Sequence, residues 1–259
     1  MEHCIIFALY LPSIDKVHVI EEIFSYIRDK KKDAKIFIGI QGNSIPETEE
    51  ILRNSDSNTD LDIEFSRVPK HLIIDSDASA FIEALRLYSQ SDMDFYRCYF
   101  IHTKGITSNN DPLRKAMFDE IFDEATITEK FIDDKVGSYG PYITLIDVPG
   151  DIAKMSCFAR FNDKAFTHPV MEYYYINTLY VIKGHLLRWF IKDVSPDFFN
   201  THVDQISDRW MFERDFMHVA DMQGFRPSFK HFHGNYSTRY VAPNMAKYEE
   251  KLNKWLKGK

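Results

Sequence analysis

Residues 4–11 read CIIFALYL, an unbroken apolar run of the length of one strand. A strand with one solvated face alternates polar and apolar residues, so this run predicts a strand covered on both faces. Strands of that kind are typical of parallel sheets that carry helices on either side. The stretch therefore predicts an α/β fold.

The segments after residue 11 alternate between helical and strand-like patterns. The helical segments carry apolar residues three or four positions apart, and the strand-like segments are apolar or alternating. This order predicts parallel strands with right-handed crossovers, in a mainly parallel, Rossmann-like central sheet flanked by helices. We expect a helix at 15–29, a strand at 34–40, a helix at 46–52 capped by Ser44, a strand at 61–68, a helix at 77–88 and a strand at 95–101.

The second half of the chain is less regular. We expect a helix over 113–131, a turn-rich strand region over 135–146, a strand and then a helix within 170–189, and a helix over 207–224 that ends at Gly224. The tail is a basic amphipathic helix, which could dock on the core or lie on an anionic membrane surface. The predicted organisation is one domain, residues 1–240, with a C-terminal helical extension, residues 241–259.

Composition excludes several classes of function. A net charge of −7 disfavours a general nucleic-acid binder, which normally presents a basic surface. The three cysteines lie far apart and form no zinc or redox motif. The N-terminus lacks the features of a signal peptide, and no segment approaches the roughly 20 apolar residues of a membrane span. We expect a soluble, cytoplasmic protein without a transmembrane segment.

The ligand-binding end of such a sheet lies outside the carboxyl ends of its strands. The strand at 95–101 is followed by His102, Thr103, Lys104 and Gly105. A hydroxyl, an imidazole, an ammonium group and a glycine suit a phosphate, because they offer donors, positive charge and close approach of the backbone. The alternative is an ordinary solvated loop.

Several short motifs follow one another in a recognisable order. His-Thr-Lys-Gly at 102–105 ends a strand, LRKAM at 113–117 opens a helix, and VGSY follows at 136–139. YINTLYVIK at 175–183 enters a helix, and WMFER at 210–214 carries a Glu-Arg pair. This order, over roughly residues 4–225, resembles rhamnan-synthesis and related polysaccharide-building glycosyltransferases with a GT-A-like fold. Asn177 stands where that family more often has glycine.

The resemblance implies transfer of a sugar from a nucleotide-sugar donor, linked to UDP, GDP or dTDP, to a hydroxyl of a glycan acceptor, with inversion. It implies that Glu213 is the catalytic base, with Asp208 and Asp215 as rivals, although a surface carboxylate is the alternative for Glu213. The predicted acceptor pocket comprises Asn177, Thr178 and Asp215.

Charge on the leaving diphosphate must be stabilised during transfer. Many GT-A enzymes hold a divalent metal there with Asp-X-Asp, but this chain has His102-Thr103-Lys104 at that place. An ammonium group cannot ligate a metal, so we hypothesise that Lys104, with Arg114, supplies the charge directly and that transfer is metal-independent. Three further candidates remain. Tyr10 could stack on the nucleotide base or lie in the core. Asp75 could contact the donor or, with Asp77, either cap a helix or bind a metal. His233, near His231, is a weak candidate metal ligand, and both histidines could instead be surface or loop residues.

Two other functions stay open. One is a non-catalytic nucleotide-sugar or glycan-binding protein on the same fold. The other is a nucleotidyl- or phosphotransferase, which would require a metal. The sequence leaves the donor, the acceptor and the oligomeric state undetermined.

Overall fold

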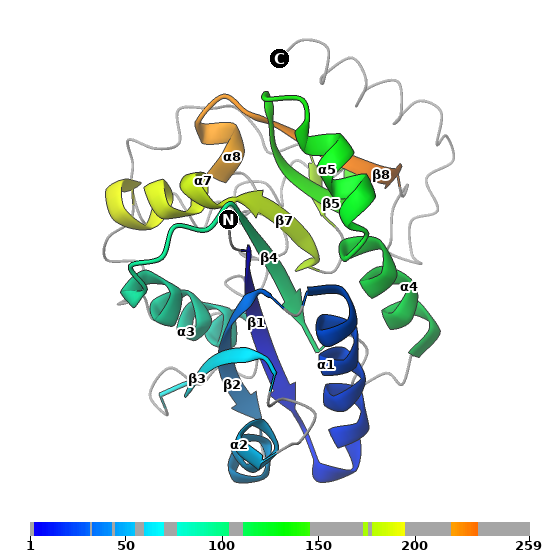
Figure 1. Ribbon diagram of the computed structural model, residues 1–259, viewed down its shortest axis with the longest axis vertical. Coiled ribbons are helices and arrows are strands. Elements are labelled where there is room, and N and C mark those ends of the chain that lie inside the picture. The colour runs from blue at the N-terminus through cyan, green and yellow to red at the C-terminus, as the bar shows by residue number, and fades with distance from the viewer. Residues whose placement is uncertain are drawn as a thin grey trace.

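The structure is a computed structural model that describes residues 3–31, 33–42, 45–54, 60–69, 77–103, 111–145, 173–175, 178–194 and 219–232. These residues form an eight-stranded sheet with helices on both faces (Figure 1). The strands are β1 His3–Leu11, β2 Lys35–Gly42, β3 Asp62–Arg67, β4 Arg97–His102, β5 Val136–Leu145, β6 Tyr173–Tyr175, β7 Tyr180–Lys183 and β8 Arg226–Phe232. The helices are η1 Ile14–Lys16, α1 Val17–Lys31, α2 Ile45–Asn54, α3 Asp77–Gln90, α4 Asp111–Ile121, α5 Glu124–Phe131, α7 Gly184–Trp189, η6 Phe190–Val194 and α8 Val219–Met222.

The strand order is β3-β2-β1-β4-β7-β5-β6, and β8 pairs with β5. The first four strands are mutually parallel, while β7 is antiparallel to both β4 and β5. Strand β5 therefore runs in the direction of β4, β8 lies parallel to β5, and β6 is antiparallel to it. This topology confirms the predicted α/β, GT-A-like fold with a mainly parallel central sheet.

Strand β1 is buried on both faces, as its unbroken apolar sequence predicts. Its even-numbered core residues, Cys4, Ile6 and Ala8, pack with α3 and α7. Its odd-numbered ones, Ile5, Phe7 and Leu9, pack with α1, α4 and α5. Each large apolar side chain buried in this way contributes about 1.5–3 kcal/mol.

Helix α3 lies directly on the backbone of β2. A methyl group added at Gly39 would lie 1.9 Å from the carbonyl oxygen of Ala80. Because the obstacle is main chain, no rotation of a side chain can relieve it. Glycine at this position therefore sets the spacing between the helix and the sheet.

We expect Gly39→Ala to lower the free energy of unfolding by about 1–3 kcal/mol, because α3 has to shift away from β2. The urea midpoint measures the loss. Adding Ala80→Gly should not restore stability, because the clash is with the Ala80 carbonyl and not with its methyl group. An unchanged midpoint for Gly39→Ala would contradict the close contact.

Three expectations for the second half need correction or lie outside the described residues. The prediction of one helix over 113–131 is wrong: α4 ends at Ile121, and the Asp123 carboxylate caps α5 by accepting from the Thr126 amide at 3.2 Å. Two strands, β6 and β7, precede the helix expected within 170–189. Of the helix expected over 207–224 only α8 is described, and it ends before Gly224, whose φ is 77°.

The C-terminal extension, residues 241–259, lies outside the described residues. Within the part of the chain that the structure describes, no helix has both the length and the apolar character needed to cross a membrane.

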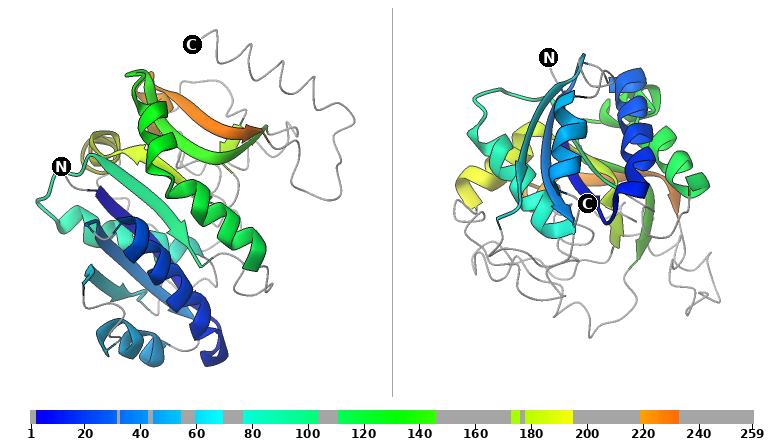
Figure 2. Two further views of the ribbon diagram at one scale, coloured as in Figure 1. Left: turned by 45° about the vertical axis from the view of Figure 1, so that its right-hand side comes forward. Right: turned by 90° about the horizontal axis from the view of Figure 1, so that it is seen from below.

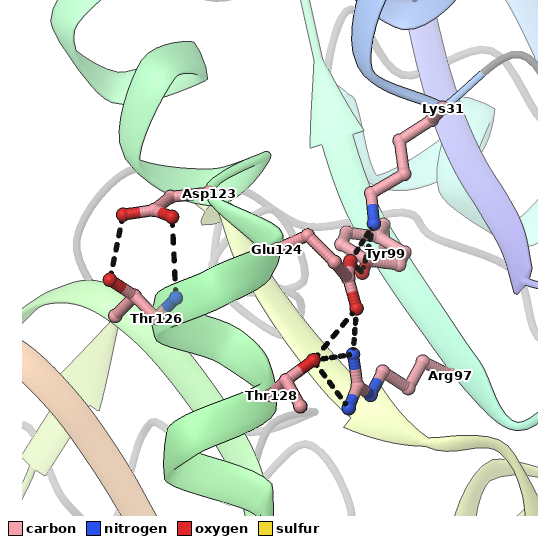
Figure 3. Close-up of polar contacts among 7 residues, drawn as sticks. All are labelled: Lys31, Arg97, Tyr99, Asp123, Glu124, Thr126 and Thr128. Atoms are coloured by element: carbon pink, nitrogen blue, oxygen red, sulfur yellow. Dashed lines mark hydrogen bonds and ion pairs between the residues drawn. The ribbon is translucent and has the colours of Figure 1, made fainter.

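An ionic cluster joins α1, β4 and α5 at the amino end of β4 (Figure 3). The Glu124 carboxylate accepts from Lys31 and Arg97, and from the Tyr99 hydroxyl at 3.0 Å. Lys31 also donates to the Tyr99 hydroxyl at 2.7 Å. Partial burial alone would raise the pKa of Glu124, but its bonds to Lys31 and Tyr99 and the charge of Arg97 outweigh this and lower the pKa to about 2.

The lowered pKa of Glu124 makes stability depend on pH. The ionised carboxylate stabilises the fold above its ordinary pKa of 4.5, and this stabilisation is lost as the pH falls toward 2. We expect Glu124→Gln to reduce stability clearly at pH 7 and progressively less below pH 4.5. Urea unfolding of both proteins at several pH values measures this, and a difference that is constant with pH would contradict the ion pairing.

Candidate functional site

The connections of β1 and β4 define a topological switch point. Helices α1 and α2 belong to one face of the sheet, whereas α3, which leads into β4, belongs to the other. The carboxyl ends of β1 and β4 therefore lie side by side where the crossovers diverge. In open α/β sheets this is the position of the ligand crevice.

Several buried polar side chains lie at the two edges of the sheet. At the amino edge the cations Lys31, Arg97 and Lys183 are buried. At the carboxyl edge, where the parallel strands end and the helices begin, most are uncharged. These are Gln41 on β2, Thr48 on α2, Ser79 on α3, His102 and Thr103 at the end of β4, and Thr178 before β7.

Thr103 fastens the end of β4 to β1. Its hydroxyl accepts from the Tyr10 amide at 3.1 Å and donates to the Tyr10 carbonyl at 3.0 Å. Its own amide donates to the Ala8 carbonyl at 3.3 Å. Since a hydroxyl has one proton, Thr103 could donate to a phosphate only by giving up the bond to the Tyr10 carbonyl.

The predicted donor-binding residues of the described chain fall on different faces. The imidazole of His102 lies on the α3 side, with its centroid 6.3 Å from that of the Phe81 ring. The half-buried Tyr10 ring packs with the core on the α1 side. Arg114 is also on the α1 side. The structure thus brings Tyr10, His102 and Thr103 to one edge and turns their side chains in different directions.

Arg114 links α4 to α1. Its guanidinium, on a residue that is 1% exposed, donates to the carboxylate of Glu22, and Lys115 Nζ lies 3.6 Å from the other oxygen of that carboxylate. One turn further along, the rings of Tyr26 and Phe118 are stacked with centroids 5.9 Å apart. The two helices lie side by side in Figure 2. Arg114 therefore has a structural role, since it joins the first turn of α4 to α1. This role does not depend on a ligand.

We expect Glu22→Gln to lower the free energy of unfolding by about 1.5–3 kcal/mol, because a neutral amide replaces the carboxylate that accepts from the buried Arg114 guanidinium. The matched control is Lys115→Ala, which removes the other cation on Glu22. Its side chain is 56% exposed, so its loss should change stability by less than about 1 kcal/mol. Equal urea midpoints for the two variants would contradict a buried pair.

Thr178 has an unusual backbone. Its φ is 50°, a left-handed conformation that costs a non-glycine residue about 1–2 kcal/mol. It lies two residues before Tyr180, which pairs with Phe100 in an antiparallel register. Thr178 therefore enters β7 at the carboxyl edge, near the end of β4. Backbone strain of this kind concentrates at functional sites.

The other predicted site residues lie outside the described residues or have undescribed side chains. Their roles stay predictions; they are Asp75, Lys104, Asn177, Asp208, Glu213, Asp215 and His233, with the side chains of Asp77 and His231. Among the residues that the structure does describe, no group of three or more His, Cys, Asp or Glu side chains could hold a metal ion.

Sequence reasoning overlooked two residues of this edge. Gln41 is a buried polar side chain at the end of β2, and its position in the apolar stretch IFIGIQG was a readable signal. Tyr180 begins β7 with its hydroxyl buried, and nothing in the apolar sequence LYVI distinguished it from a core residue.

No protein-family model and no curated protein matches the sequence. Solved structures with low sequence identity are similar to this chain, among them the following two. A Bacillus anthracis protein assigned as a glucose-1-phosphate thymidylyltransferase, in complex with a sucrose, is 12% identical with a TM-score of 0.43, over 90% of this chain and 87% of that one. Core-mannan synthase A from Aspergillus fumigatus, in its Mn/GDP form, is 10% identical with a TM-score of 0.38, over 90% and 72%. Likeness of this degree assigns no activity to the chain.

Proposed function

We propose that this chain is a glycosyltransferase that moves a sugar from a nucleotide-sugar donor to a hydroxyl of a glycan acceptor. The observation that carries the proposal is the set of buried, uncharged polar side chains at the carboxyl edge of a GT-A-like sheet, at its switch point. Hydroxyl, amide and imidazole groups are suited to a polyhydroxylated ligand. The ordered motifs that resemble polysaccharide-building transferases support the same conclusion.

In this proposal the donor lies across the ends of β1 and β4, with Tyr10 and Asp75 toward the nucleoside and Lys104 beside the diphosphate. The acceptor oxygen attacks the anomeric carbon while the bond from that carbon to the diphosphate oxygen breaks. Glu213 takes the acceptor proton, and the nucleoside diphosphate leaves with its electron pair. Asn177, Thr178 and Asp215 hold the acceptor, and the configuration at the anomeric carbon is inverted.

The charge on the diphosphate is stabilised by Lys104 without a divalent metal in this proposal. Helices α1, α3 and α4 begin at the carboxyl edge of the sheet, because they follow the parallel strands β1, β3 and β4 in the chain. Their amino ends contribute partial positive charge to the same region. We place the reaction in polysaccharide or glycoconjugate synthesis in the cytoplasm, with peripheral membrane contact through residues 241–259.

A specific observation favours a second candidate, binding of a nucleotide sugar or glycan without turnover. The Thr103 hydroxyl proton is donated to Tyr10, and the Arg114 guanidinium is paired with Glu22. Two of the groups predicted to stabilise the leaving diphosphate are thus already engaged. A binding protein needs no such stabilisation.

We expect one of UDP, GDP or dTDP, and its hexose conjugate, to raise the melting temperature. A ligand at 100 times its dissociation constant stabilises by about 2.7 kcal/mol, which is several degrees for a chain of this length. The shift should persist in EDTA. No shift with any nucleotide or nucleotide sugar would contradict the donor site, and a shift that requires Mn²⁺ would contradict the role of Lys104.

The variant Glu213→Gln separates the two candidates. If Glu213 is the base, the variant keeps the thermal shift and loses transfer by at least about a hundredfold. Release of nucleoside diphosphate in the presence of glycan acceptors measures transfer. Wild-type protein that binds the donor but releases none with any acceptor would favour the binding protein.

A further inference from the structure

Tyr180 has a buried hydroxyl group. The residue is 0% exposed and begins β7, and its hydroxyl has no partner within the described chain. Burying a polar group unsatisfied costs about 1–3 kcal/mol, so such groups are uncommon in native proteins. Burial also raises the pKa of Tyr180 well above its usual value, so the phenol stays neutral and keeps its proton.

The Tyr180 ring is held in place by aromatic neighbours. It stacks on Phe100 with centroids 4.7 Å apart and an interplanar angle of 16°, and on Tyr175 at 5.8 Å. These two contacts stabilise the ring in its present orientation. By contrast, the Tyr175 hydroxyl donates to the Ser228 carbonyl at 3.1 Å and lies 3.0 Å from the Ser138 hydroxyl.

The place of Tyr180 in the sheet connects this residue to the candidate site. Tyr180 pairs with Phe100, and His102 lies two residues further along β4 on the same face. The strained residue Thr178 lies two residues before Tyr180. Two energetic costs, a left-handed threonine and an unsatisfied phenol, thus coincide at the start of β7, on the carboxyl edge of the sheet.

We propose that the start of β7 is a subsite for a sugar hydroxyl and that Tyr180 Oη is its hydrogen-bond partner. This inference rests on the function proposed above and adds a residue to it. A neutral phenol offers one donor and accepts in return, which matches an alcohol, itself both donor and acceptor. Because Tyr180 is 0% exposed, a sugar can reach its hydroxyl only if the packing around this side chain opens.

The chain offers a matched control for this subsite. Tyr139 on β5 is also 0% exposed, and its hydroxyl likewise has no partner among the described residues. It packs with the α4 and α5 side, on the face opposite Tyr180. Tyr180→Phe and Tyr139→Phe therefore remove the same group from two equally buried positions, and only one of them is in the proposed subsite.

We expect both variants to melt at or above the wild-type temperature, because each loses an unsatisfied hydroxyl. Only Tyr180→Phe should weaken sugar recognition, by about two- to tenfold for one hydrogen bond. The probes are UDP, GDP and dTDP, their conjugates UDP-glucose, GDP-mannose and dTDP-rhamnose, and the methyl glycosides of these sugars as acceptors. If Tyr180→Phe binds the nucleotide sugar more weakly but binds the bare nucleoside diphosphate as well as wild type does, the subsite belongs to the donor sugar. If instead the KM for the acceptor rises, the subsite belongs to the acceptor.

Two outcomes would overturn the inference and are distinguishable. If wild-type protein binds and transfers, and Tyr180→Phe matches Tyr139→Phe with every probe, the subsite is refuted and the proposed function stands. If wild-type protein responds to none of the probes, the proposed function and the subsite are refuted together.

Discussion

The double burial of β1 is the constraint on which the structure depends. Its side chains pack alternately into two cores, one beneath α3 and α7 and the other beneath α1, α4 and α5. A strand with two buried faces must lie inside a sheet, and parallel partners on both sides require crossovers on opposite faces. The switch point between β1 and β4 follows from this arrangement. Thr103 then extends the pairing of these strands past their last register position by binding the Tyr10 backbone.

Buried polar groups are stabilised differently at the two edges of the sheet. At the amino edge, the Glu124 carboxylate pairs with both Lys31 and Arg97, so its removal would leave two buried cations without this counterion. Such a closed ionic set stabilises but offers nothing to a ligand. At the carboxyl edge the buried groups are mainly neutral, so a ligand can exchange hydrogen bonds with them without exposing a buried charge.

Local patterns predicted the first half of the fold because each element there carries its own signal. The apolar run of β1 and the spacing in α1 needed no distant partner to be read. The prediction of one helix over 113–131 failed because apolar residues continue across the break between α4 and α5. The Asp123 side chain, which caps α5, starts the second helix. Position at the carboxyl edge was predictable for His102 and Thr103. The pairing of Arg114 with Glu22 was not, because 92 residues separate them and nothing in either segment names the other.

Thr178 and Tyr180 show why a site can escape sequence reasoning. A φ of 50° and an unsatisfied hydroxyl are properties of the folded chain and leave no trace in residue spacing. Together they cost about 2–5 kcal/mol, a large part of the 5–15 kcal/mol by which a domain is typically stable. Glycine at the first position and phenylalanine at the second would remove both costs without disturbing the stacked rings. Both costs lie at the carboxyl edge, where the proposed function places the ligand, and departures from local rules are expected at functional sites.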